Sequence, residues 1–229
     1  MFYDATYGLV VIGMLLCLLA QSSMKSTFSR YSRIRSISGI TGAEAAVRIL
    51  RNAGIYDVQV RCIHGNLTDH YNPKTKELCL SDSIYGSISV AALGVAAHEC
   101  GHAIQHAKGY APLSFRTALV PFANIGSQIA MPLVLIGFIF NSRSSFLFIQ
   151  LGIYAFALAV LFQFVTLPVE FNASRRALHI LSDTGMLQPE ETGYTKKVLT
   201  AAALTYVAGA ASSALQLFRL ILLANNRRR

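Results

Sequence analysis

Four long apolar stretches, separated by polar segments, dominate the pattern of the chain. They cover residues 7–20, 118–140, 146–167 and 198–224. A helix needs about 20 mostly apolar residues to cross a bilayer, and the two central stretches have this length as they stand. The first can be extended at both ends, and the fourth is long enough but rich in small residues. The pattern therefore predicts a multi-pass α-helical membrane protein.

The long polar segment, residues 22–116, has the mixed pattern of a small α/β domain. Thr41 and Glu44 have the spacing of a capping box, which predicts a helix directly after Thr41. Three strands are then expected, at residues 56–63, 67–71 and 77–81. An almost continuous apolar pattern from Ser83 to Lys108 predicts one long buried helix.

Within that helix, residues 98–102 have the form H-E-x-x-H. His98 and His102 share one helix face with Cβ atoms roughly 5–6 Å apart, so both imidazoles can reach one Zn²⁺. Glu99 then lies beside the metal, where a carboxylate can take a proton from a metal-activated water. Three fixed residues are a short signature, so the rest of the sequence must decide whether this motif is a metal site.

The strand at residues 77–81 precedes this helix and bears on substrate binding. In zinc peptidases, a sheet edge beside the site can hold an extended peptide by strand addition. Residues 77–81 are the candidate edge, and an internal strand is the alternative.

A catalytic zinc needs three protein ligands and one open position. His106 lies about 12 Å from His98 along the helix axis, so it is expected to support or pack rather than to ligate. Glu170 follows a predicted membrane hairpin that returns the chain to its starting side. A carboxylate there is costly unless it is paired or bound to metal. From position alone, Glu170 is either the third ligand or an interfacial glutamate.

An oxyanion donor besides the metal is also expected. The candidates are His70, Arg175, His179 and Tyr206. An ordinary surface or core role is the alternative for each. His179 is placed first, because nine residues after Glu170 are expected to return it roughly to the same helix face.

The distribution of charge predicts which side of the membrane the polar segment occupies. The net charge is +9, and a basic cluster follows the first apolar stretch directly at Lys25, Arg30, Arg33 and Arg35. The positive-inside rule places such a cluster in the cytoplasm. Because no Lys or Arg precedes the first stretch, it is expected to be a retained anchor rather than a signal peptide. No basic platform interleaved with aromatic residues occurs, so nucleic acid is not an expected partner.

The fourth apolar stretch leaves the topology open. If it crosses the membrane, the basic tail at residues 227–229 ends outside, against the positive-inside rule. A helix that packs against the others without crossing is the alternative.

The chain resembles the bacterial YugP-type membrane zinc metallopeptidases, the neutral zinc metallopeptidase family. The matching stretches are residues 67–71 (LTDHY), 97–105 (AHECGHAIQ), 167–177 (LPVEFNASRRA) and 201–207 (AAALTYV). A looser similarity is to the HtpX and Ste24 membrane peptidases, whose third ligand is the glutamate of an E-x-x-x-D pattern. The resemblance implies Glu170 as the third ligand, in a gluzincin-like site. Ser174 stands where that pattern has aspartate, so the support that the aspartate gives is an open question here.

Together these patterns predict a multi-pass helical membrane protein with a small zincin-like α/β cytoplasmic domain. Its expected segments are an anchor (1–23), the zincin-like segment (24–116), a transmembrane hairpin (117–167), cytoplasmic helices with the third ligand (168–197), and a C-terminal membrane helix with a basic tail (198–229).

The expected function is a zinc-dependent endopeptidase in the cell membrane. It would act on peptides or membrane proteins at the cytoplasmic face of the lipid bilayer. An inert zinc-binding scaffold or adaptor and a zinc amidohydrolase for non-peptide amides are the alternatives. A small transporter is less well supported, because no apolar stretch supplies an obvious charged partner for Arg219.

Overall fold

The computed structural model describes residues 6–140 and 145–228, with no account of the side chains of residues 227 and 228. The chain forms two compact units. The apolar unit comprises Met1–Gln21, Phe115–Leu167 and Thr205–Arg229, and the mixed unit comprises Ser22–Ser114 and Pro168–Leu204. All four boundaries between the units fall inside long helices.

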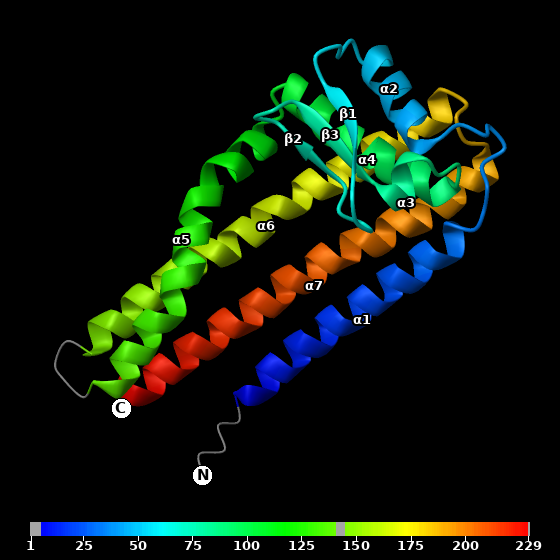
Figure 1. Cartoon of the computed structure of the whole chain (residues 1–229). Coiled ribbons are helices and arrows are strands. Elements are labelled where there is room, and N and C mark those ends of the chain that lie inside the picture. The colour runs from blue at the N-terminus through cyan, green and yellow to red at the C-terminus, as the bar shows by residue number, and fades with distance from the viewer. Residues whose placement is uncertain (1–5, 141–144, 229) are drawn as a thin grey trace. The chain divides into compact units, whose positions relative to one another are not determined.

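The apolar unit consists of parts of four helices (Figure 1). These are α1 (Tyr7–Tyr31), α5 (Ala111–Ile139), α6 (Ser145–Asp183) and α7 (Pro189–Arg228). Each is long and apolar enough to cross a membrane, as predicted. Small residues allow α5 and α6 to pack closely, since a Cβ on Gly152 would lie 2.8 Å from the carbonyl oxygen of Ala130. The expected hairpin linker at residues 141–144 and the last residue of the basic tail lie outside the described residues.

The mixed unit contains a three-stranded sheet. Its strands are β1 (Gln59–Ile63), β2 (His70–Asn72) and β3 (Glu77–Ser81), in the order β1-β3-β2. Strand β3 pairs in parallel with β1 and antiparallel with β2. The interpretation of residues 77–81 as the sheet edge is therefore wrong, and the alternative of an internal strand is right. The physical reason is burial: Cys79 and Leu80, whose side chains point to opposite faces of the sheet, are both buried, as expected for a strand that is covered on both faces.

Helix α2 (Gly42–Asn52) begins with the predicted capping box. Thr41 Oγ1 accepts the N–H of Glu44 at 3.2 Å, and the Glu44 carboxylate accepts the N–H of Thr41 at 2.8 Å. Both bonds satisfy donors that the first helical turn would otherwise leave free. The amphipathic helix then buries Ile49 and Leu50 in the core.

The predicted helix from Ser83 to Lys108 is two helices instead of one. Helix α3 (Asp82–Tyr85) stops at Gly86, and α4 (Val90–Ala107) begins after a new cap at Ser89. The Ser89 hydroxyl accepts the N–H of Ala92 at 3.1 Å. The continuous apolar pattern concealed this break, because the residues on both sides of it are buried.

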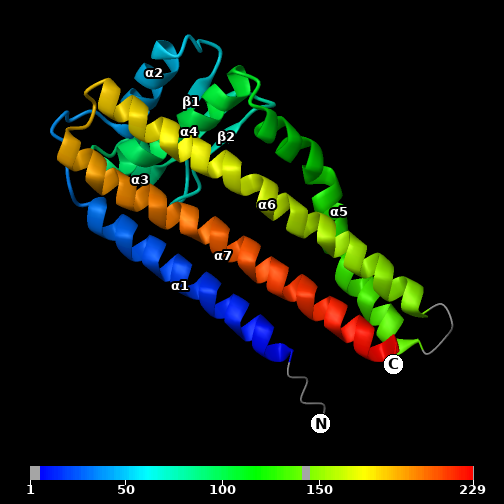
Figure 2. The ribbon, with the colours of Figure 1, turned by 180° about the vertical axis from the view of Figure 1, so that it is seen from behind.

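Helix α4 is the centre of the mixed unit and is buried on nearly all sides. Helix α2 packs against it, as do β2 and β3. The parts of α6 and α7 that belong to this unit lie side by side (Figure 2), and both approach α4 closely at its glycines. Helix α6 ends at Asp183 and α7 begins at Pro189, and α6 continues without a break through Pro168.

Candidate metal centre

The two motif histidines lie one turn apart on α4. Their ring centroids are 4.8 Å apart and their planes are nearly perpendicular, at 86°. Both side chains are mostly buried, with 14% of His98 and 12% of His102 exposed. The helix therefore presents two imidazoles on one side while its other faces lie in the core.

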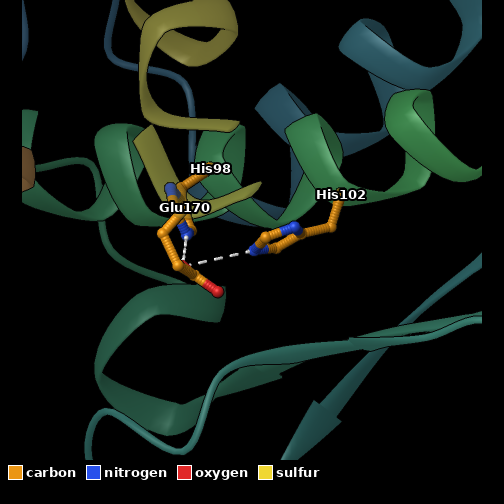
Figure 3. A group of neighbouring side chains, drawn as sticks. All are labelled: His98, His102 and Glu170. Carbon is orange, nitrogen blue, oxygen red and sulfur yellow. Dashed lines mark hydrogen bonds and ion pairs between the residues drawn. The ribbon is translucent and has the colours of Figure 1, made fainter. Parts of the chain in front are cut away.

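Glu170 on α6 completes the cluster (Figure 3). Its Oε2 atom lies 3.2 Å from His98 Nε2 and 3.6 Å from His102 Nε2, and the side chain is 3% exposed. Each of the three residues offers one ligand atom, and these atoms lie within 4.8 Å of one another. Two ligands at 2.0–2.1 Å from a tetrahedral ion stand roughly 3.3 Å apart. The nitrogen–oxygen distances fit one Zn²⁺ ion.

A glycine inside the motif brings α6 within reach. A Cβ on Gly101 would lie 2.8 Å from the carbonyl oxygen of Ala173 and 3.1 Å from its Cα. These are backbone atoms of a helix, which cannot rotate aside as a side chain can. Only a residue without Cβ allows α4 and α6 this close, and this approach places Glu170 opposite the histidines.

His102 is oriented by a chain of hydrogen bonds that the sequence analysis missed. Its Nδ1 atom lies 3.0 Å from the Oε1 atom of Gln105, which is fully buried. The Gln105 amide donates to the carbonyl oxygen of Val169 at 2.9 Å and to Asn172 Oδ1 at 3.0 Å. Arg176 Nε also donates to Asn172 Oδ1, at 2.7 Å.

This chain determines the tautomer of His102. Since Arg176 can only donate, Asn172 presents its oxygen, and Gln105 donates with its nitrogen. The remaining Gln105 oxygen must then accept from His102 Nδ1–H. In the neutral ring, Nε2 then carries the lone pair on the side of Glu170, which is the state that a metal ligand requires.

His98 receives a simpler support. Its Nδ1 atom lies 3.1 Å from the hydroxyl of Ser174, one helical turn after Glu170. Ser174 stands at the position where the resemblance led us to expect aspartate. The open question from the sequence thus has an answer, because a neutral hydroxyl contacts His98 where a carboxylate was expected.

The electrostatic field of the site favours a cation. Burial lowers the pKa of His102, but the close Glu170 carboxylate and the charge of Glu99 outweigh burial and raise that pKa above its ordinary value. Glu99 is itself largely buried, with 8% of its surface exposed. The same negative groups that favour a protonated imidazole would favour a bound metal ion.

Comparison with known proteins shows the family of the chain. A sequence model described as "Putative neutral zinc metallopeptidase" matches residues 6–225. The chain is also 44% identical over 209 residues to the "Putative membrane protease YugP" of Bacillus subtilis (strain 168), covering 91% of this chain and 92% of that protein. The chain belongs to this metallopeptidase family. No solved structure matches it.

Among the other predicted residues, His106 and His70 contact partners outside the three-residue cluster, and Tyr206 belongs to the other unit. His106 Nδ1 is 2.9 Å from the Tyr71 hydroxyl, which links the end of α4 to β2. His70 is exposed on β2 and contacts the backbone of Thr68. Tyr206 belongs to the apolar unit, so its position relative to the cluster is not described.

The expectation that His179 shares the face of Glu170 is wrong. Nine residues make two and a half turns at 3.6 residues per turn, and α6 is continuous between the two positions. His179 therefore lies on the opposite side of the helix, where it lines a cavity together with Arg175. Arg175 is likewise turned away from Glu170, by about 140° at 100° per residue.

Proposed function

We propose that the protein is a zinc-dependent membrane endopeptidase in which His98, His102 and Glu170 hold the metal. The observation that carries this proposal is the cluster of three ligand atoms within 4.8 Å of one another. The supports at Ser174 and Gln105 leave both Nε2 atoms turned toward Glu170. Family membership supports the peptidase class.

In the proposed mechanism, Glu99 is the general base. Bound Zn²⁺ would supply a Lewis acid that polarises the peptide carbonyl and makes water more acidic. Glu99 accepts the proton of the attacking water and later delivers it to the leaving amine. Its place next to His98 in the sequence and its influence on His102 support this role.

For the substrate we propose pairing with β2 in place of β3. Strand β2 has β3 on one side and forms one edge of the sheet. It also contacts α4, and the bond from Tyr71 to His106 ties it to this helix one turn beyond His102. An extended peptide added to this edge would use its main chain for recognition.

We propose that the site faces the cytoplasm. The support is the basic cluster, which follows the apolar part of α1 and belongs to the mixed unit. The positive-inside rule assigns such a segment to the cytoplasmic side.

The variant Glu99→Gln tests the function. It keeps the shape of the side chain but removes the base, so the purified full-length protein should bind zinc as the wild type does. Cleavage of a fluorogenic peptide should fall about 10²- to 10⁴-fold. Glu190→Gln is the matched control, since Glu190 is an exposed carboxylate in the first turn of α7, outside the cluster and outside β2.

Two outcomes would contradict the proposal. Full cleavage by Glu99→Gln would remove Glu99 as the base. A zinc-loaded wild type that cleaves no peptide would favour the scaffold, or an amidohydrolase if it cleaves a non-peptide amide.

A further inference from the structure

A cavity beside α6 extends from the neighbourhood of the metal cluster toward α7, since Ser174, the support of His98, is among its lining residues. It has a volume of about 720 Å³ and runs between α6 and α7 within the mixed unit. We call it the α6–α7 groove. The residues that matter below are Phe171, Arg175 and His179 on α6, and Lys196, Thr200 and Leu204 on α7. Figure 2 shows the two helices side by side along this region.

Along the helix axes, the side chains of the groove change from apolar to cationic. At one end, where both helices pass into their apolar parts, Phe171 and Leu204 are 44% and 50% exposed. One turn further along α6 comes Arg175, and two turns back along α7 comes Lys196. The groove is therefore apolar at the end next to the membrane helices and cationic about 6–12 Å further in.

The charge of the groove is of one sign. Among the described residues, no Asp or Glu lines it, and neither Arg175 nor Lys196 has a hydrogen bond or ion pair with a described residue. A neighbouring cavity of about 590 Å³ lies on the other side of α7 and shares Lys196. That cavity adds Arg30 and Lys197, again with no acidic residue among the described ones. Both cavities thus offer unpaired positive charge.

We propose that the α6–α7 groove binds an anionic phospholipid. The acyl chain would lie against Phe171 and Leu204, and the phosphate would contact Arg175 and Lys196. This polarity matches a lipid that enters from the bilayer. Basic pockets between membrane helices are known to take such headgroups. A free phosphate would use the cations but would leave the apolar end uncovered, which is why a lipid fits better.

A single-tryptophan reporter can test this, because the chain contains no Trp. Leu204→Trp places a fluorophore at the apolar end of the groove of the full-length protein in lipid bilayers. Brominated phosphatidylglycerol and brominated phosphatidylcholine then serve as quenchers of equal acyl structure. Leu151→Trp, at an exposed apolar position of α6 outside the groove, reports ordinary lipid contact.

We expect the groove reporter to be quenched preferentially by the anionic lipid. Arg175→Gln and Lys196→Gln should each reduce this preference roughly fivefold, the usual effect of one cation near a membrane surface. Lys74→Gln, an exposed cation near the sheet, should leave it unchanged. Leu151→Trp should be quenched equally by both lipids. Zinc content is measured in every variant as a check of the fold.

Three results would overturn the proposal. The first is equal quenching of the groove reporter by both lipids. The second is displacement of the brominated lipid by inorganic phosphate or glycerol phosphate, which would make the ligand a soluble anion. The third is displacement by a cleavable peptide, which would assign the groove to the substrate.

Discussion

The two faces of α6 in the mixed unit differ in the size and charge of their side chains. One face packs against α4 with small residues such as Ala173 and Ala177, and its polar groups Glu170 and Ser174 each contact a histidine. The other face carries large or charged side chains and borders the α6–α7 groove. Residues only one position apart, such as Glu170 and Phe171, therefore belong to different environments. One helix can thus hold a preorganised metal cluster and, a half-turn away, an adaptable ligand surface.

Removal of the third ligand should have the largest effect on the cluster face. Glu170→Ala should lower zinc affinity roughly 100-fold or more, since a zinc site shares about 10–16 kcal/mol among its ligands. His106→Ala is the control and should keep its zinc, because His106 contacts Tyr71 instead. Competition with a chelator measures both affinities. An unchanged affinity in Glu170→Ala would assign the third ligand elsewhere.

Loss of the amide that orients His102 should have the next largest effect. Gln105→Leu keeps the volume but removes the acceptor for His102 Nδ1–H, so zinc affinity should fall about 10- to 100-fold. The same chelator competition, with thermal unfolding recorded alongside, separates a loss of metal from a loss of fold. Equal affinities for Gln105→Leu and wild type would count against the orienting role.

The hydroxyl that supports His98 should matter less. Ser174→Ala removes one neutral hydrogen bond, worth about 0.5–1.5 kcal/mol, so zinc affinity should fall about 2- to 10-fold. Ser174→Asp introduces the carboxylate that the distant relatives have, and should restore or raise the affinity. A larger loss of zinc affinity in Ser174→Ala than in Gln105→Leu would reverse the ranking of the two supports.

The smallest effect on zinc is expected from the groove face. His179→Gln should leave the affinity within about twofold, as is usual for an exposed substitution outside the site. Ser174→Ala is the matched comparison, because Ser174 lines the same groove but also contacts His98. A tenfold loss of zinc affinity in His179→Gln would show that the two faces are not independent.

Local patterns predicted much of this structure. The capping box at Thr41 and the four apolar helices depend on residues close together in sequence, and both are confirmed. The H-E-x-x-H spacing likewise predicted a shared helix face for His98 and His102. Helical periodicity alone, counted correctly, would have excluded His179 from the face of Glu170.

Non-local arrangement was the harder part. The sequence of residues 77–81 does not indicate that this strand pairs with β1 on one side and with β2 on the other. The prediction of a sheet edge therefore failed. The break before α4 did have a local indication, in Gly86 and the serine at position 89, but buried apolar residues on both sides concealed it. Position along the chain left Glu170 as either a ligand or an interfacial glutamate, and only the resemblance favoured the ligand, because the sequence does not show how α6 meets α4.

Two functional residues were missed although the motif itself contains or adjoins them. Gly101 was treated as a variable position of H-E-x-x-H, yet its missing side chain sets the distance between α4 and α6. Gln105, three residues after His102, lies where a helix would bring its side chain beside the imidazole. A fully buried glutamine needs hydrogen-bond partners for its polar atoms. A glutamine one turn after a motif histidine on a buried helix was therefore the indication that His102 has an orienting partner.

The bond from Gln105 to the carbonyl of Val169 joins parts of the site that are otherwise separate. Val169 directly precedes Glu170, so a single amide orients one ligand and is anchored to the backbone that carries another. Ligands from two different helices are thereby coupled in position, and a displacement of α6 would turn the His102 ring as well as withdraw the carboxylate. The coordination sphere should accordingly be lost as a unit rather than one ligand at a time.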